Sequence, residues 1–368
     1  MIAIFITIVA LFVGLLHLII YEMMVTVFAV HSIGALLAVR ISFIVLGLSF
    51  IVASILASFY DNRASRAFYT ASVVWLGLAI YLFLAAVVYC IAVWIASFVH
   101  VDSELNTFGA FLILLSLLVV IYGLGHAKKV KVTSVSVLLP NLPIFWQGKT
   151  VIWMSDLHLG QVNGRSFAAK VATLVNGEKP DIIFIGGDLF DGVKVDEKGI
   201  ISPLSKLVAP LGTYFITGNH EEFRDSAGFI DAVKSIGVGV LMNEYVDIEG
   251  VRIIGVDDRD SMNKDKFKGI LARLAPGNGI PAILLKHQPD LLDLAEKSGI
   301  SFQISGHTHR AQMFPLSLIT RWIYHGYDYG LHAFKSMQVY TSSGTGTWGP
   351  PIRVGTDAEI VKMRFIKK

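Results

Sequence analysis

Long apolar stretches in the first third of the chain restrict its fold more than any other feature of the sequence. A helix that crosses a bilayer needs about 20 mostly apolar residues. Four stretches reach or approach that length: Ile2–Ile20, Ile41–Phe59, Ala71–Phe98 and Phe108–Gly125. The sequence therefore predicts an N-terminal all-α transmembrane module of about four helices, residues 1–127, in a multi-pass protein of the cell membrane.

Two parts of this module allow more than one interpretation. The apolar segment Met23–Val39 contains His31 and Ser32 and follows a glutamate, so we interpret it as a loop or an interfacial helix, with a fifth span left open. The first run lacks a positive n-region and a small-residue cleavage site, so we expect it to be retained rather than cleaved as a signal peptide. His17 lies in that run, where an ionisable group is a functional candidate by default; the simpler interpretation is a hydrogen bond between helices.

The distribution of lysine and arginine predicts the orientation, because cytoplasmic loops are enriched in both. The opposite side carries one cation, Arg40, and the acidic residues Asp102 and Glu104. With four spans, the C-terminal part of the chain lies on the same side as the cation-rich loops and is predicted to be cytoplasmic. The cations that follow the second and fourth spans are Arg63, Arg66, Lys128, Lys129 and Lys131.

Composition agrees with this division and excludes some classes of protein. Charged residues make up 16% of the chain, against about 25% in soluble domains. The net charge of +3 is too small to indicate a nucleic-acid partner. The only cysteine, Cys90, can form neither an intramolecular disulfide nor a cysteine-based metal site. No protein partner can be inferred from the sequence.

After about Lys128 the composition becomes that of an ordinary globular domain. Residues 128–150 are expected to form a linker and a first strand, because the prolines of Leu139–Pro143 disfavour a helix. Apolar β-rich runs then alternate with helical stretches such as Arg165–Asn176, which indicates an α/β domain over residues 151–368. Most runs are apolar on both faces, so both faces of the sheets should be covered. The predicted strands are Val151–Met154, Ile182–Ile185, Tyr214–Thr217, Val251–Val256, Ala282–Leu285, Phe302–Ile304, Met337–Thr341 and Ile360–Phe365.

Side chains that can bind metals follow five of these strands. In open α/β sheets, ligands gather beyond the carboxyl ends of the strands. These side chains are therefore expected to converge on one point, although they are spread over roughly 150 positions. They are Asp156 and His158, then Asp188, then Asn219 and His220, then His287, and finally His307 and His309.

The residue types indicate the chemistry. Imidazole and carboxylate together suit manganese, iron and zinc. Two metals about 3.5–4 Å apart can clamp the attacking and leaving oxygens of a phosphoryl displacement. In an extended segment, Asp156 and His158 point the same way, and so do His307 and His309. The sequence thus predicts two divalent metal ions, with manganese favoured, and a phosphate-ester substrate.

Taken together, these motifs resemble those of the calcineurin-like metallophosphoesterases. The family pattern D-x-H, G-D-x-x, G-N-H-[DE], a lone His and G-H-x-H is present in order, and the resemblance covers Val151–Phe365. It implies a two-sheet αββα sandwich. The segments Ser155–Gly160, Ile254–Asp258 and Ser343–Gly346 are most similar to a bacterial branch with N-terminal transmembrane segments, some of whose members resemble enzymes that cleave UDP-diacylglucosamine or act on phospholipid headgroups.

The resemblance also implies a role for each motif residue. His220 would be the catalytic residue that stabilises or protonates the leaving oxygen, while a hydroxide bridging the metals attacks phosphorus in line. Asp191 and Glu221 would orient ligands. Arg310 stands where this branch usually has glycine, and would either touch a substrate phosphate or face solvent. The implied metal ligands are Asp156, His158 and His309 for the first ion, Asn219, His287 and His307 for the second, and Asp188 as the bridge.

These features predict a metal-dependent phosphoesterase that hydrolyses a phosphomonoester or phosphodiester. Because the chain is anchored, the membrane bilayer is its expected partner and a membrane-proximal or lipid-linked substrate is favoured. The alternatives are a tethered hydrolase of soluble nucleotides and, less favoured since the ligand set is complete, a non-catalytic scaffold or sensor. The aromatic segment Met313–Tyr329 would either cover the core or form a lip near the metals that touches the bilayer or an acyl chain.

Overall fold

The computed structural model describes residues 2–99, 104–192, 194–222, 226–277 and 279–367, with side chains from Leu11 onward. It consists of two compact units. The first contains residues 1–126 and the short segment 349–352, and the second contains residues 127–348 and 353–368. Asp102, which entered the prediction of orientation, lies outside the described residues.

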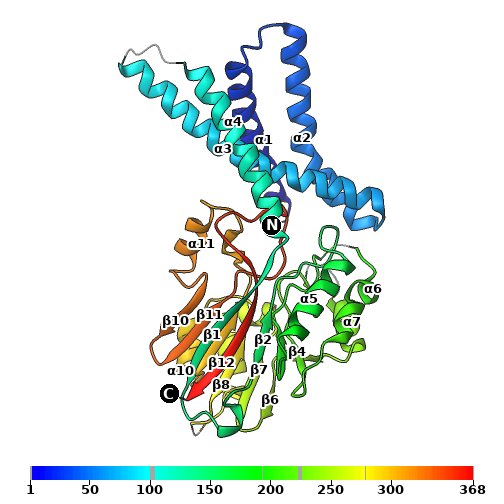
Figure 1. Ribbon diagram of the computed structural model, residues 1–368, viewed down its shortest axis with the longest axis vertical. Coiled ribbons are helices and arrows are strands. Elements are labelled where there is room, and N and C mark those ends of the chain that lie inside the picture. Colours follow the sequence, from blue (N-terminus) through cyan, green and yellow to red (C-terminus); the bar gives the residue numbers. More distant parts are fainter. Residues whose placement is uncertain (1, 100–103, 193, 223–225, 278, 368) are drawn as a thin grey trace. The chain divides into compact units, whose positions relative to one another are not determined.

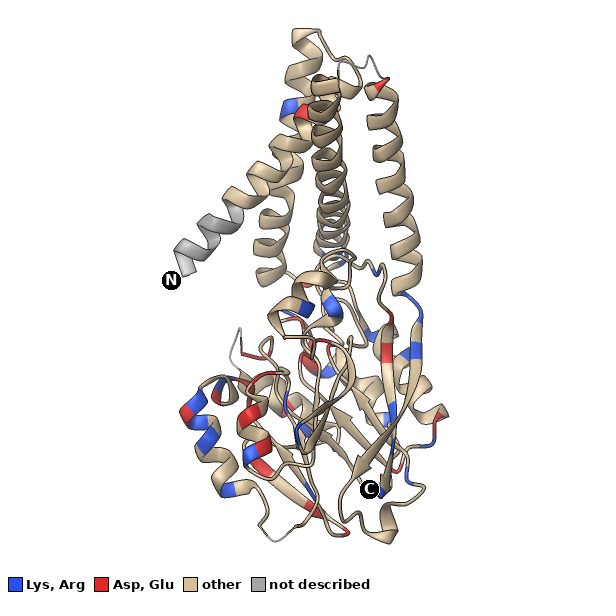
Figure 2. Ribbon diagram, turned by 90° about the vertical axis from the view of Figure 1, so that its left-hand side faces the viewer, with Lys and Arg blue, Asp and Glu red and all other residues tan. Residues whose placement is uncertain are grey.

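The first unit is built from apolar helices: α1 (Ile2–Val27), α2 (Ile33–Phe59), α3 (Arg63–Val99) and α4 (Leu105–Ala127) (Figure 1). Among the described side chains, α2, α3 and α4 are long and apolar enough to cross a membrane, and the described part of α1, Leu11–Val27, is shorter. Figure 2 shows that charged residues are sparse on these helices and numerous on the second unit. The chain is therefore a membrane protein.

The interpretation of Met23–Val39 as a loop or a separate interfacial helix is wrong. Its first part continues α1 to Val27, and its second part begins α2 at Ile33. Ser32, expected to interrupt the apolar run, instead accepts a hydrogen bond from the Ala35 backbone N–H (3.2 Å) and caps α2. A serine at this position stabilises a helix start, because it satisfies a backbone donor that has no partner within the helix.

The second unit contains two six-stranded sheets. The order of the first sheet is β1 (Val130–Leu139), β12 (Ala358–Lys367), β2 (Val151–Met154), β3 (Ile182–Ile185), β4 (Thr213–Phe215) and β5 (Gly239–Val240). The order of the second is β10 (Gly330–Phe334), β11 (Met337–Thr341), β9 (Phe302–Ser305), β8 (Ala282–Leu285), β7 (Val251–Gly255) and β6 (Glu244–Ile248).

Helices cover the outer faces of both sheets, as the apolar character of the strands predicts. Val171 and Phe229, from α5 and α7, belong to the core beside the first sheet. Phe267 and Leu292, from α9 and α10, belong to the core beside the second. A third core between the sheets includes Phe302, so the predicted αββα sandwich is confirmed. The helices are α5 (Arg165–Gly177), α6 (Glu197–Ile201), α7 (Ser226–Ser235), α8 (Asp258–Met262), α9 (Lys264–Leu274), α10 (Leu292–Lys297) and α11 (Ser317–Ile323), with 3-10 turns η1 (Ile144–Trp146), η2 (Ser202–Lys206) and η3 (His309–Ala311).

The predicted strands all form, with bounds that agree within about two residues. The segment 128–150 contributes β1, which pairs with β12 along its whole length. The prediction did not include β5, β6 and β10. The strand β5 has two residues, and the first two residues of β6 are exposed. Such segments lack the apolar run by which a buried strand is recognised.

The sheet topology places the metal-capable residues just beyond the carboxyl ends of parallel strands. In the first sheet β2, β3 and β4 are parallel, and in the second β7, β8 and β9 are parallel. Each motif follows the carboxyl end of one of these strands, so that parallel pairing brings residues distant in the sequence to a common edge.

Candidate metal centre

The structure brings the motif residues of both sheets into two adjacent clusters. In each cluster, one ligand atom from every residue lies within 4.8 Å of the others. All these residues except His307 are buried, and His307 is half-buried. One cluster comprises Asp156, His158 and His309, and the other comprises Asp188, His287 and His307.

The first cluster joins the end of β2 to the end of β9. His158 Nε2 lies 2.9 Å from His309 Nε2, and His309 Nε2 lies 3.5 Å from Asp156 Oδ1. Asp156 Oδ1 also accepts a hydrogen bond from the His307 backbone N–H (2.9 Å). Gly344 lies against this cluster with φ +80°, and a Cβ there would approach Asp156 Cβ to 2.9 Å. Glycine is therefore required at position 344 for both conformation and space.

Asp188 lies between the two clusters. Its Oδ2 is 3.7 Å from His158 Nε2 and 3.3 Å from His287 Nε2. Its Oδ1 accepts a hydrogen bond from the His220 backbone N–H (2.8 Å). One carboxylate thus faces a histidine of each cluster, as a bridging ligand must.

The second cluster is held by the second sheet. His287 Nδ1 lies 2.8 Å from the Gly186 carbonyl oxygen and donates to it, so Nε2 is the ring nitrogen that faces Asp188 Oδ2. Burial, with the charge of His287, lowers the pKa of His307 to about 3. The His307 imidazole is therefore neutral at pH 7, the state in which histidine binds metals. The buried Oδ1 of Asn219 has no hydrogen-bond partner among the described residues.

The backbone of the ligand residues is mostly in the left-handed region. The φ angle is +56° at Asp156, +47° at His158 and at Asp188, +68° at His307 and +46° at His309. This region is uncommon for residues other than glycine, although Asp, Asn and His enter it more readily than most. Conformations of this kind persist only where the surrounding structure enforces them, and they concentrate at functional sites.

Glu221 enforces part of this geometry. Its carboxylate is fully buried and accepts three backbone hydrogen bonds, from Asp188 (2.9 Å), Gly218 (2.7 Å) and Phe190 (3.0 Å). Burial and the neighbouring Asp188 raise the pKa of Glu221 to about 8. The side chain ties the loop after β3 to the loop after β4.

Asp191 and His220 form a third group with His158. Asp191 Oδ1 lies 3.4 Å from His158 Nδ1, so that His158 presents its Nε2 to the first cluster. His220 Nδ1 lies 3.2 Å from the Asp191 carbonyl oxygen and donates to it. The His220 ring packs edge-on against Trp348, with centroids 5.7 Å apart.

Arg310 and the acidic segment at 257–260 belong to neither cluster. The Arg310 guanidinium lies 4.8 Å above the centre of the Tyr329 ring, a cation–π contact, which neither of the two predicted alternatives included. Asp257 caps α8, and Asp258 is buried and accepts hydrogen bonds from Gln288 (3.1 and 3.2 Å).

Sequence reasoning missed a buried arginine that supports the site. Arg353 donates to the carbonyl oxygens of Ser343 (2.7 Å), Gly344 (3.2 Å) and Gly346 (2.7 Å). Burial lowers its pKa to about 10, so the group stays charged at pH 7. It fixes the loop that carries Gly344 against Asp156. Nothing near Arg353 in the sequence marks it, because its partners are backbone carbonyls.

The chemistry of the donor set fits two divalent cations. Three buried ligand atoms, Asp156 Oδ2, Asn219 Oδ1 and His287 Nε2, have no hydrogen-bond partner in the described part of the chain. Buried polar atoms are otherwise satisfied in the great majority of cases. The two imidazole nitrogens 2.9 Å apart, on His158 and His309, would repel each other unless one carried a proton or both bound a cation. Oxygen and nitrogen donors with a shared carboxylate suit manganese, iron or zinc.

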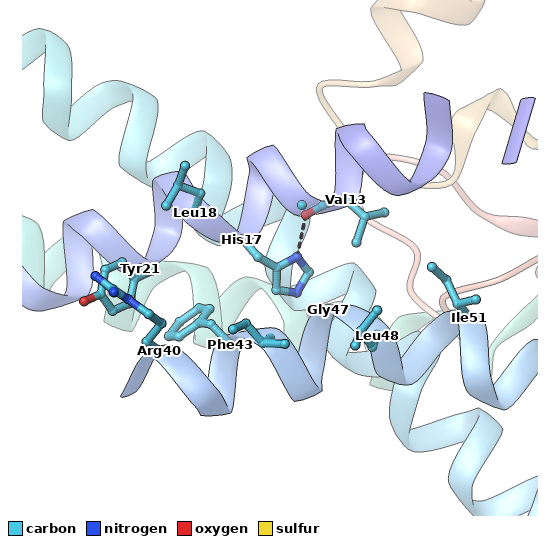
Figure 3. Close-up of a pocket in the computed structure, with 11 residues that line it drawn as sticks. Val13, His17, Leu18, Tyr21, Arg40, Phe43, Gly47, Leu48 and Ile51 are labelled. Atoms are coloured by element: carbon cyan, nitrogen blue, oxygen red, sulfur yellow. Dashed lines mark hydrogen bonds between the residues drawn. The ribbon is translucent and has the colours of Figure 1, made fainter. Parts of the chain in front are cut away.

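His17 in the apolar helices has an ordinary structural role. Its Nδ1 lies 2.8 Å from the Val13 carbonyl oxygen and its Nε2 accepts from the Trp75 indole (3.0 Å). It lines a cavity of about 400 Å³ between α1 and α2, together with Tyr21 and Arg40 (Figure 3). Both ring nitrogens are paired, so the interpretation as a helix–helix hydrogen bond is confirmed.

Comparison with known proteins assigns the second unit to one family. Residues 149–311 match the Metallophos family, described as calcineurin-like phosphoesterase. A metallophosphoesterase of Campylobacter jejuni is 32% identical over 255 residues, 68% of this chain and 67% of that protein. A zebrafish (Danio rerio) transmembrane protein with metallophosphoesterase domain is 30% identical over 270 residues, 68% of this chain and 61% of that protein. A Bacillus subtilis metallophosphoesterase is 30% identical over 258 residues, 65% of this chain and 88% of that protein.

Replacing Glu221 should weaken both the fold and metal binding. In Glu221→Gln an amide NH₂ group would face at least one of the three backbone N–H donors, which costs about 1–3 kcal/mol. Because ligand orientation suffers, metal affinity should fall about 10- to 100-fold. Thermal unfolding and metal titration of the purified protein would measure both effects. Glu244→Gln, on the exposed part of β6, is the matched control and should change neither; equal behaviour of the two variants would contradict the role of Glu221.

Proposed function

Because the chain belongs to the calcineurin-like metallophosphoesterase family, we propose that it hydrolyses a phosphomonoester or phosphodiester with two divalent metal ions. The observation that carries the proposal is the position of Asp188, whose Oδ2 faces a histidine of each cluster at 3.7 and 3.3 Å. Two cations that share one carboxylate are close enough to act on one phosphate group.

The proposed ligands follow the two clusters. Asp156, His158 and His309 would hold the first ion, and Asn219, His287 and His307 the second, with Asp188 common to both. When bound, two such ions supply Lewis-acid charge to the phosphoryl group and make water acidic enough to act as a nucleophile near pH 7. Manganese is favoured, because it accepts the hard carboxylate and amide oxygens as well as imidazole.

The protein groups around the ions position the reaction. Two ligand carboxylates neutralise only part of the charge of two divalent ions, so an anionic phosphate is attracted to the remainder. His220, oriented by the Asp191 carbonyl and packed against Trp348, is the proposed acid that gives a proton to the leaving oxygen. Asp191 and Glu221 position this histidine and the ligand loops. No direct role is proposed for Arg310, because its guanidinium is engaged with Tyr329.

The membrane anchor favours a substrate at the bilayer. Tethering raises the local concentration of any lipid-linked phosphate ester around the site. A hydrolase of soluble nucleotides is the second candidate, because the clusters themselves do not select between the two. A scaffold function is disfavoured because every ligand of the family pattern is in place. The distribution of lysine and arginine favours a cytoplasmic location of the second unit.

Asp188→Asn should abolish metal-dependent turnover. Losing the shared carboxylate should lower kcat on bis(p-nitrophenyl) phosphate about 1,000-fold or more, and should lower the manganese bound per chain. The detergent-purified protein, stripped of metal and reloaded with manganese, provides the assay, with elemental analysis for metal content. Asp293→Asn is the control, since this exposed aspartate pairs only with Lys335 among the described residues. Wild-type protein that binds no metal would contradict the ligand assignment.

His220→Asn should affect substrates according to their leaving group. A general acid contributes about 100- to 10,000-fold when the leaving oxygen is basic and little when it is not. The variant should therefore lose far more activity on an alkyl phosphodiester than on a p-nitrophenyl diester, measured as kcat/KM on both. His325→Asn, on an exposed turn after α11, is the control. An equal loss on both substrates would assign His220 a structural role instead.

The orientation can be tested by fusing reporters to the C-terminus. In a bacterial host, green fluorescent protein should be fluorescent and alkaline phosphatase inactive, because the former folds in the cytoplasm and the latter outside it. The opposite pattern would place the catalytic unit outside the cell and would contradict the orientation inferred from lysine and arginine.

A further inference from the structure

The short helix α11, Ser317–Ile323, exposes nearly all of its apolar side chains. Trp322 is 79% exposed and Leu318 is 59% exposed, and none of the residues of α11 is buried. The interpretation in which Met313–Tyr329 covers the core is therefore wrong for this helix. We call Phe314 and the helix that follows it, Ser317–Ile323, the α11 lip. Its large exposed side chains are Phe314, Leu318, Ile319, Trp322 and Ile323.

Elsewhere in the described part of the catalytic unit, large exposed apolar side chains lie in smaller groups or singly. Ile144 (79% exposed) and Phe145 (36% exposed) are neighbours in η1, whereas Val208 before β4 and Met262 at the end of α8 lie on separate segments. Single exposed apolar residues are normal, whereas a contiguous apolar patch on a folded domain marks an interaction site.

The α11 lip lies beside the metal clusters. It follows η3, which begins with the ligand His309. The Tyr324 ring at its end lies 6.4 Å from the ring of the ligand His307. Gln312, just before the lip, exchanges hydrogen bonds with the Trp348 backbone (2.8 and 2.9 Å), and Trp348 packs on His220. Whatever covers the lip therefore comes close to the proposed site of reaction.

The chain enters the catalytic unit from α4 at the edge of the first sheet where the metal ligands begin. Only Lys128 and Lys129 separate the apolar helix α4 from β1. The first residue of β1, Val130, pairs with Ala358, the first residue of β12. Since β12 runs antiparallel to β2 with Val361 opposite Trp153, both strand starts lie beyond the carboxyl end of β2, where the metal ligands begin.

A second contact confirms this placement within the catalytic unit. The Glu359 backbone N–H, one residue into β12, donates to the carbonyl oxygen of Gly344 (2.9 Å), and Gly344 lies against Asp156. Figure 1 shows α11 at the end of the sheets where β1 begins. The covalent attachment, the metal clusters and the α11 lip thus share one edge, and a two-residue connection cannot hold that edge far from the bilayer.

We propose that the α11 lip is a membrane-contacting surface that inserts its apolar side chains into the lipid interface beside the metal centre. Tryptophan favours the interfacial region, and aliphatic side chains gain from burial below it. Arg321 on the same helix and Lys128 and Lys129 before β1 add cationic groups that suit anionic lipid headgroups. The occupant is the bilayer rather than a second protein, because the chain is already anchored there at this edge.

Insertion of the lip also implies a class of substrate, an inference that rests on the proposed phosphoesterase function. A lip that lies in the interface brings the metal centre to the depth of lipid headgroups. The substrate is then an amphiphilic phosphate ester whose apolar chains stay in the bilayer while its phosphate reaches the clusters. A soluble nucleotide would gain nothing from the lip.

The insertion can be measured without turnover in the full-length chain. Cys90 is the only cysteine, so a Cys90→Ala background allows one fluorescent label at a time. An NBD label on Leu318→Cys, in vesicles of phosphatidylcholine and phosphatidylglycerol, should shift to the blue and be quenched by nitroxide-bearing lipid. The control is Val208→Cys, similarly exposed at 67% but at the amino end of β4, which should show neither effect.

Three outcomes of the labelling experiment are informative. Severalfold stronger quenching at position 318 than at 208 supports insertion. Equal quenching at both positions overturns the proposal. A blue shift at 318 without lipid quenching, with a dimer in cross-linking, would assign the lip to contact between two copies and also overturns it. None of these outcomes depends on hydrolysis, so failure here leaves the phosphoesterase proposal standing.

The substrate class is tested separately by a ratio of activities. Combining Leu318→Ser and Trp322→Ser should lower the turnover of a vesicle-borne phospholipid diester relative to a soluble chromogenic diester about tenfold, because two interfacial anchors are lost. An unchanged ratio, with quenching at 318 intact, would mean that the lip anchors the domain without selecting lipid substrates. Asp188→Asn should abolish the turnover of both substrates, whereas the lip variant should change mainly their ratio. Comparing the two variants therefore separates failure of the lip from failure of the catalytic site.

Discussion

Buried carboxylates at the junction of two sheets are the constraint on which the rest of the catalytic unit depends. Asp156, Asp188 and Glu221 are almost completely removed from water, and an uncompensated buried charge is among the most costly features a protein can contain. Glu221 is compensated by three backbone N–H groups. Asp156 and Asp188 each accept one backbone N–H and otherwise face imidazoles, and Asp156 Oδ2 has no hydrogen-bond partner among the described residues. Cations between these groups would neutralise the buried negative charge. The arrangement that lowers the stability of the metal-free fold therefore suits a phosphate-binding metal centre.

The backbone around the site is held in a form that few sequences would adopt alone. Left-handed φ angles at Asp156, Asp188 and His309 turn the side chains of separate loops toward each other. Each such residue costs of order 1 kcal/mol. The buried network offsets this cost, because Glu221 joins the loops after β3 and β4 while Arg353 fixes the loop of Gly344 against the first cluster. The site is therefore rigid by construction, as precise placement of reacting groups requires.

The two units are suited to different surroundings, and the α11 lip is the part of the catalytic unit proposed to contact the bilayer. The apolar helices satisfy their backbone groups internally, as a hydrocarbon environment demands. The catalytic unit buries its cores within three layers but leaves one apolar surface exposed, next to the clusters and at the edge where the membrane helix enters. If the substrate is a lipid-borne phosphate ester, as proposed, the site must face the interface, and the exposed lip would provide the apolar contact for that orientation.

The sequence alone determined the apolar helices, the alternation of strands and helices, and the residues at the strand ends, because each of these is a local pattern of side-chain types. The spacing within D-x-H or G-H-x-H is likewise local, so the family could be identified without coordinates. Only the tertiary structure decided how the ends of β3 and β8 meet across two sheets and which atoms face Asp188. It also decided that Arg310 lies over Tyr329, that Arg353 is buried among carbonyls, and that α11 is exposed. These features depend on contacts between segments far apart in the chain, where register and packing, rather than residue type, determine which groups meet.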